Sequence, residues 1–183
     1  MRKEFAVTTP PRDPRWFLAL VMGLPMAGAA AIIGLSGIGG RSILPVVGAL
    51  VATIFLVTFL LLGWAGKRRA IAIEDGALDV LATFYRRRVP MQDIDLDKAR
   101  IIDLREHAEW RPRLKTNGYA LPGLSAGWFR TRDWTSLFCM VTDRQRVLVL
   151  PLRAGGAVLL SAERPTELLN ALRAADDAQH GHR

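Results

Sequence analysis

The charge pattern of the first 66 residues constrains this chain more than any other feature. No Asp, Glu, Lys, Arg or His occurs in residues 16–40 or 42–66, and Arg41 alone separates these two uncharged runs. Each run could form a helix of roughly 37 Å at about 1.5 Å per residue, longer than the ~30 Å hydrocarbon core of a bilayer. We therefore expect a transmembrane helical hairpin over residues 16–66, which excludes an ordinary soluble protein.

A secretory signal peptide is the alternative interpretation of the first run. Basic residues precede it, and Ala27, Ala29 and Ala31 resemble a cleavage site. The run is longer than a signal-peptide apolar segment of about 7–15 residues, and a second run follows at once. These two features favour the hairpin.

Small residues recur every four positions within both runs. Such spacing creates faces on which two membrane helices approach closely, although Gly and Ala are common in membrane helices in any case. The helix-packing candidates are Gly23, Ala27 and Ala31 in the first run and Gly48 and Ala52 in the second.

The distribution of basic residues predicts the orientation of the hairpin. Lys and Arg flank the outer ends of the two runs, whereas the connecting turn contains one Arg, so both termini are expected to be cytoplasmic. We interpret the Pro-rich residues 1–15 as a cytoplasmic tail. The flanking basic residues are Arg2, Lys3, Arg12 and Arg15 on one side and Lys67, Arg68 and Arg69 on the other.

The remaining residues suffice for one domain, predicted over 67–175, with a polar tail at 176–183. Asp75-Gly76 is typical of a two-residue hairpin turn, which would pair residue 74 with 77, 70 with 81 and 67 with 84. Further strands are expected over 88–91, 98–104, 127–132, 137–142, 146–150 and 157–160. A last amphipathic helix starts near Pro165, so the pattern indicates a small β barrel capped by a helix. The single Cys139 is interpreted as a core residue.

These elements, together with three short motifs, resemble the bacterial pleckstrin-homology (PH) domains that follow a pair of transmembrane helices. The motifs are Lys115-Thr116-Asn117-Gly118, Leu121-Pro122-Gly123 and Gly127-Trp128-Phe129, and the resemblance covers residues 71–174. It implies a mainly-β, PH-like, partly open barrel plugged by the C-terminal helix, at the bacterial inner membrane. It does not imply an enzyme, and no ligand follows from it because the fold supports many unrelated binding roles.

The predicted register brings two basic clusters together next to the second uncharged run. Phe84 and Tyr85 would return beside the start of the first strand, and the basic residues would face anionic lipid headgroups. A solvated charge run is the alternative. The membrane-apposed candidates are Lys67, Arg68, Arg69, Arg86, Arg87 and Arg88.

A second basic stretch, residues 110–132, contains no Asp or Glu. Its Gly and Pro residues suggest a long shaped loop that contacts an anion, a headgroup or a partner strand, while a packed loop with solvated arginines is equally compatible. The candidates are Arg111, Arg113, Lys115, Asn117, Gly118, Trp128, Arg130 and Arg132. Nucleic acid is not expected, because residues 67–183 hold 20 basic and 15 acidic residues without a reading motif.

No motif in the sequence supports catalysis. Residues 123–127 match GxSxG, but a nucleophile elbow needs a strand before Ser125 and a helix after it, and a strand pattern follows instead. The three histidines lack metal-ligand spacing, so no metal, cofactor or enzymatic activity is expected. Two functions remain: a membrane-anchored module that recruits a protein or contacts headgroups, and an assembly subunit that forms homo-oligomers or complexes through its helices.

Overall fold

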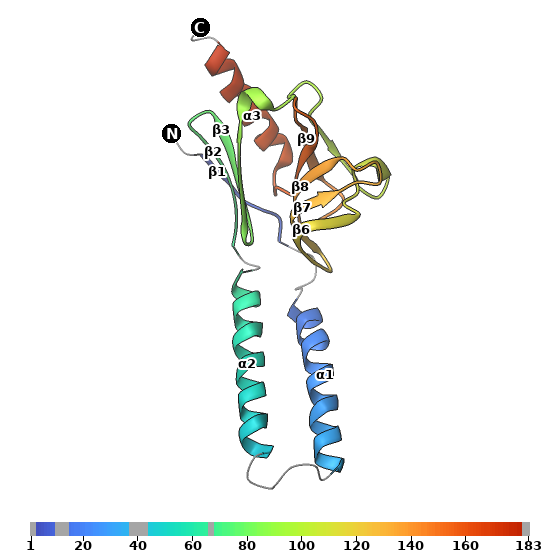
Figure 1. Cartoon of the computed structure of the whole chain (residues 1–183). Coiled ribbons are helices and arrows are strands. Elements are labelled where there is room, and N and C mark those ends of the chain that lie inside the picture. Colours follow the sequence, from blue (N-terminus) through green and yellow to red (C-terminus); the bar gives the residue numbers. More distant parts are fainter. Residues whose placement is uncertain (1–2, 10–14, 37–43, 66–67, 181–183) are drawn as a thin grey trace. The chain divides into compact units, whose positions relative to one another are not determined.

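The computed structural model describes residues 3–9, 15–36, 44–65 and 68–180 (Figure 1). The chain divides into two compact units. One unit, Asp13–Lys67, contains helices α1 (Arg15–Ser36) and α2 (Leu44–Ala65). The other unit combines Met1–Arg12 with Arg68–Arg183 and contains the strands and helix α3 (Pro165–His180). A segment from before the helices thus joins the domain that follows them.

Helices α1 and α2 lie side by side and run in opposite directions (Figure 1). Large apolar side chains are exposed along both, among them Leu24 and Val46, at 64% and 67% exposure. In the part of the chain that the structure describes, no helix has both the length and the apolar character needed to cross a membrane. Arg41 lies outside the described residues.

The first sheet has the order β1-β2-β3-β4, with every pair antiparallel. Asp75 and Gly76 both have positive φ, 49° and 68°, as expected for the tight turn that suits twisted strands. Glu74 pairs with Ala77 and Ala70 with Leu81, so the predicted hairpin register is confirmed. The strands are β1 (Lys3–Phe5), β2 (Arg69–Glu74), β3 (Ala77–Ala82) and β4 (Tyr85–Pro90).

The second sheet has the order β5-β9-β10-β8-β7-β6. Strands β8 and β10 are parallel, and its other pairs are antiparallel. Its strands are β5 (Arg100–Ile102), β6 (Leu114–Leu121), β7 (Leu124–Arg130), β8 (Ser136–Val141), β9 (Val147–Pro151) and β10 (Ala157–Leu160). Two short 3₁₀ turns, Met91–Asp93 and Ala108–Trp110, lie in the connections.

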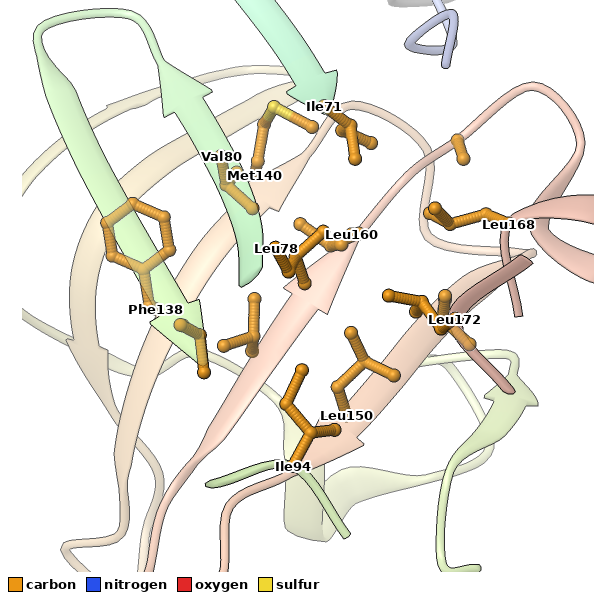
Figure 2. Packing of buried hydrophobic residues seen from close by; sticks show 14 of the residues in the cluster. Ile71, Leu78, Val80, Ile94, Phe138, Met140, Leu150, Leu160, Leu168 and Leu172 are labelled. Atoms are coloured by element: carbon orange, nitrogen blue, oxygen red, sulfur yellow. The ribbon is translucent and has the colours of Figure 1, made fainter. Parts of the chain in front are cut away.

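The main core lies between the two sheets and α3, as Figure 2 shows. Leu78 and Val80 from β3 meet Phe138 from β8, and Leu168 and Leu172 add the apolar face of α3. A second cluster covers the opposite face of the second sheet, where Trp110 packs against it. Burial on both faces explains why β8, β9 and β10 are continuous apolar runs rather than alternating ones. The mainly-β domain with a C-terminal helix is as predicted.

The predicted N-terminal tail is wrong for residues 3–9. Lys3–Phe5 forms β1 on the edge of β2, with Phe5 opposite Ile71. The Thr8 amide then donates to the Ser161 carbonyl at 3.1 Å, and the Thr142 hydroxyl donates to the Thr8 carbonyl at 2.6 Å. An edge strand offers unpaired backbone groups, and this segment occupies them. Local composition could not reveal a pairing partner so distant in sequence.

Two further segments also differ from the predictions. The expected loop over 110–132 is largely a β hairpin, because Pro122-Gly123 forms a two-residue turn between β6 and β7 with Gly123 at φ 79°. Here the glycines shape strands instead of interrupting them. Helix α3 continues through His180, so residues 176–180 of the predicted polar tail are helical.

Candidate functional site

The three consecutive arginines of β4 do not form one surface. Arg87 pairs with buried Val80 and therefore faces the core. Its guanidinium carbon lies 4.4 Å from the centre of the Trp128 ring and 5.7 Å from that of Phe138. Burial lowers the pKa of Arg87. This residue is a half-buried cation packed on aromatic rings between the sheets.

Arg86 and Arg88 face the opposite way, into solvent. Arg86 holds Asp79 with two nitrogens, Nε at 2.9 Å from Oδ1 and Nη2 at 2.5 Å from Oδ2. The hydrogen bonds that Arg86 donates to the Asp79 carboxylate raise the pKa of Arg86. Arg88 lies 3.6 Å from an Asp75 oxygen. Acidic neighbours thus partly neutralise both exposed arginines, and such pairs contribute little to stability.

The start of β2 lies beside the β3–β4 turn, as the sequence predicts. Arg69 pairs with Ala82, and the Thr83 amide donates to the Arg68 carbonyl at 2.8 Å. Arg68 is exposed, and so is Phe84, which follows Thr83 in this turn and meets the Tyr119 ring edge-on at 6.1 Å between ring centres. Arg69 is half-buried, its Nη1 has no hydrogen-bond partner in the described structure, and burial lowers its pKa. Lys67 lies outside the described residues.

The β6–β7 hairpin distributes the predicted loop residues over different surroundings. Asn117 lies opposite Trp128, whose ring faces the core, whereas Lys115 lies opposite Phe129 in the second apolar cluster. Arg130 is the last residue of β7, and its guanidinium carbon lies 5.5 Å from the centre of the exposed Trp134 ring. The structure therefore does not bring these residues into one site.

Two glycines of this hairpin allow a close approach of its strands. A Cβ on Gly127 would lie 2.7 Å from the Asn117 carbonyl oxygen, and a Cβ on Gly118 would lie 2.9 Å from the Ala126 carbonyl oxygen. Gly127 also has φ 105°, a conformation that favours glycine. Gly118, predicted as part of a ligand or partner loop, is therefore a position where the backbones pack closely.

Arg132, the last residue of the predicted loop, is exposed beside Asp133 in the connection to β8.

Arg111 and Arg113 instead line a hollow of about 350 Å³, together with Leu104, Arg105, Pro112 and Arg144. Sequence reasoning missed Arg105 and Arg144. They meet because Ile102 of β5 pairs with Val147 of β9, which brings the connections next to these strands together. No local motif signals that pairing.

The residues considered for catalysis, Ser125 and Cys139, both lie within strands of the second sheet. Ser125 lies within β7 opposite Val141, and the strand continues after it to Arg130, where a nucleophile elbow would need a helix. Cys139 is fully buried in the second cluster, and burial raises its pKa. Among the described residues, no group of three or more His, Cys, Asp or Glu side chains could hold a metal ion.

The small residues of the helices remain uncovered in the described structure. Ala27, Ala31 and Ala52 are exposed, and a Cβ on Gly23 or Gly48 would meet no described atom within 4 Å. No described side chain of the paired helix fills these positions.

Two sheets packed around one core and closed by a C-terminal helix define a PH-like domain. The family model described as Bacterial PH domain matches residues 69–175, and the chain belongs to this family. No curated protein and no solved structure matches the chain. The matched region begins at the first residue of β2 and ends within α3, so β1, α1 and α2 lie outside it.

Proposed function

We propose that the chain is a membrane-anchored, non-enzymatic binding module at the cytoplasmic face of the bacterial inner membrane. The observation that carries the proposal is the pair of uncharged runs, whose described helices expose large apolar side chains along their length. Soluble proteins rarely leave so many neighbouring apolar groups uncovered. A bilayer would cover them, and the PH-like domain would then recruit a protein or contact anionic headgroups.

Anchoring and orientation can be tested with cysteine labelling in the Cys139→Ala background. Arg41→Cys places a thiol in the turn expected outside the cytoplasm, and Ala174→Cys places one on the domain. A membrane-impermeant maleimide should label Arg41→Cys in intact cells and Ala174→Cys only after lysis. Extraction of the chain by alkaline carbonate would contradict anchoring, and the opposite labelling pattern would contradict the orientation.

Contact between the domain and lipid headgroups is the more specific part of the proposal. Arg68 and Phe84 are exposed at the same end of the β2–β3–β4 sheet, where the Thr83 amide donates to the Arg68 carbonyl, and Arg68 follows the end of α2 by three positions. Cationic and aromatic side chains both suit the headgroup layer, and each basic residue near an anionic leaflet contributes about 1 kcal/mol. Arg86 and Arg88 add exposed positive charge on the same hairpin, although each has an acidic neighbour.

A fluorophore attached at Phe84→Cys tests this contact in vesicles that carry a nitroxide on the lipid headgroup. We expect strong quenching at Phe84→Cys and weak quenching at the matched Asp177→Cys. Asp177 is a suitable control because it lies at the end of the domain away from Phe84. Gln179, two residues further along α3, lies against Gly76, and Gly76 and Phe84 lie at opposite ends of β3. Equal quenching at both positions would remove the support for headgroup contact.

The second candidate function is an assembly subunit that oligomerises or docks through its helices. It is favoured by the uncovered small residues, because Gly and Ala faces let membrane helices pack closely. Replacing Gly23, Ala27 and Ala31 with Leu should abolish a detergent-stable assembly, whereas Val21→Leu should not. An unchanged assembly in the triple variant would leave the binding module as the better proposal.

A further inference from the structure

The four-arginine hollow of the PH-like domain has no assigned role. It encloses about 350 Å³, within the range of about 300–1,000 Å³ that is usual for small-ligand sites. Arg105, Arg111, Arg113 and Arg144 line it together with Leu104 and Pro112, and no Asp or Glu is among the lining residues. Its size and charge both suit a small anion.

Backbone hydrogen bonds fix the walls of the hollow. The Leu104 amide donates to the Arg144 carbonyl at 2.8 Å, which joins the two connections beside β5 and β9. The Arg113 amide donates to the Arg130 carbonyl at 3.0 Å, which holds the segment with Pro112 and Arg113 against β7. The guanidinium groups therefore project from anchored backbone positions.

Arg111 is further fixed through its side chain. Its Nε donates to the Leu104 carbonyl at 2.5 Å, and its Nη2 donates to the Arg105 carbonyl. These bonds use part of a guanidinium group that carries five N–H donors. The remaining donors are held at the hollow with little freedom left to lose when a ligand binds.

The arginines of the hollow have carboxylates nearby but none in direct contact within the described structure. The nearby carboxylates of Asp103 and Asp143 accept the backbone amides of Arg105 and Gln145, respectively. None of the four lining arginines forms an ion pair with a described carboxylate. This contrasts with Arg86 and Arg88, each of which has an acidic neighbour. An anion in the hollow would therefore lie near four positive charges that no direct ion pair occupies.

We propose that this hollow binds a phosphate-bearing anion, either a phospholipid headgroup or a soluble phosphate compound. The planar guanidinium group donates two parallel hydrogen bonds to phosphate oxygens, and several such groups can address one phosphate from different sides. The proposal rests on the binding role proposed above and names its ligand chemistry. Arg111 holds the Leu104–Arg105 backbone through its hydrogen bonds to both carbonyls, while Arg105, Arg113 and Arg144 supply the exposed donors.

Chemical modification of arginine tests the site in the full chain. The purified protein in neutral detergent is treated with phenylglyoxal in sodium phosphate or in sodium chloride of equal ionic strength, and modified residues are mapped by mass spectrometry. Phosphate should slow modification of Arg105, Arg113 and Arg144 by about tenfold or more. The exposed Arg146 and Arg153, which do not line the hollow, should react equally in both salts.

A second arm distinguishes the two sources of phosphate. The chain is placed in nanodiscs of phosphatidylcholine alone or with phosphatidylglycerol, without added phosphate. Protection that requires phosphatidylglycerol identifies a lipid headgroup, and protection by inorganic phosphate alone identifies a soluble anion. Absence of protection in both arms would overturn the phosphate site, while the labelling tests of membrane anchoring would stand independently.

Substitutions inside and outside the hollow distinguish binding at this site from non-specific attraction to the positive charge of the protein. Calorimetric titration with inorganic pyrophosphate should give affinity about tenfold or more weaker for Arg105→Gln and for Arg144→Gln. Arg144→Lys keeps the charge but loses the planar fork, so its affinity should be intermediate. Arg146→Gln is the matched control and should bind like the parent chain. An equal loss in Arg146→Gln would show that binding reflects overall charge, contrary to the proposal.

Discussion

The guanidinium carbon of Arg87 lies 4.4 Å from the centre of the Trp128 ring, and this contact joins the two sheets of the domain. Arg87 belongs to β4 at the edge of the first sheet, and Trp128 belongs to β7 of the second. The Trp128 ring in turn meets Phe138 edge-on at 5.2 Å. A charged residue thus takes part in the packing between sheets.

Replacing Arg87 should therefore destabilise the domain. Arg87→Gln is expected to lower the free energy of unfolding by about 1–2 kcal/mol, because it removes a half-buried cation from an aromatic face. The exposed Arg88→Gln should change it by about 0.5 kcal/mol or less. Denaturant unfolding of the full chain in detergent, followed by near-ultraviolet circular dichroism, measures both.

A double-mutant cycle of Arg87→Gln with Trp128→Leu isolates the contact itself. We expect a coupling energy of about 1 kcal/mol. If the two substitutions are additive, the stacking makes no net contribution and each residue stabilises the domain through other neighbours.

The sequence predicts those parts of the fold that depend on neighbouring residues. Asp75-Gly76 specifies a hairpin turn by itself, and the register of β2 and β3 follows from the turn. Side chains alternate between the two faces of a strand, and Arg87 lies on the inner face of β4 because it is opposite Val80. The sequence predicts a strand only from residue 88, so Arg86, Arg87 and Arg88 are expected to share one charged surface, whereas β4 begins at Tyr85 and its alternation separates Arg87 from the other two.

The hollow and β1 could not be predicted because both depend on distant pairing. Arg105 and Arg144 meet only because β5 pairs with β9, and β1 reaches β2 across the whole helical segment. The glycines and prolines of the 110–132 stretch are typical of loops and predict one. In the structure, Gly127 is required within a strand, where the neighbouring backbone comes too close for a side chain.

The requirement for glycine at position 127 can be tested against a matched position. At Gly155 the φ of 93° strains any other residue, but no described atom lies within 4 Å of a Cβ added there, so Gly155→Ala tests the backbone strain alone. We expect it to cost about 1–2 kcal/mol of unfolding free energy. Gly127→Ala adds contacts of 2.7 Å and 2.8 Å with the backbone of Asn117 and Gly118, so its loss should exceed that of Gly155→Ala by at least about 1 kcal/mol. Equal losses would mean that the hairpin relaxes without cost.

The N-terminal segment should depend on the buried hydroxyl of Thr142. Thr142→Val removes the hydrogen bond to the Thr8 carbonyl at nearly constant volume and leaves that acceptor without this donor. We expect a loss of about 1–3 kcal/mol and faster hydrogen exchange at the Thr8 amide, which is bonded to Ser161. Thr116→Val is the control. The exposed Thr116 hydroxyl donates to the Trp128 carbonyl, and loss of this hydrogen bond should cost about 0.5 kcal/mol or less. Unchanged exchange at Thr8 would show that the segment is held without Thr142.

Tyr119 should make the domain less stable in alkaline solution. Its hydroxyl is buried without a hydrogen-bond partner in the described structure, and burial raises the pKa of the phenol. The unfolded chain has an ordinary tyrosine pKa near 10, so it releases this proton at lower pH than the folded chain. Unfolding is therefore favoured progressively as the pH rises above about 10, and the stability is fully present below that value.

Tyr119→Phe removes both the unpaired hydroxyl and this pH dependence. The variant should be as stable as the parent or more stable near neutral pH, because no buried polar group is left without a partner. Its unfolding free energy should also fall less steeply between about pH 9 and 11. The difference between the ultraviolet titrations of parent and variant reports the phenol directly, and a midpoint at or below about 10 would contradict a raised pKa.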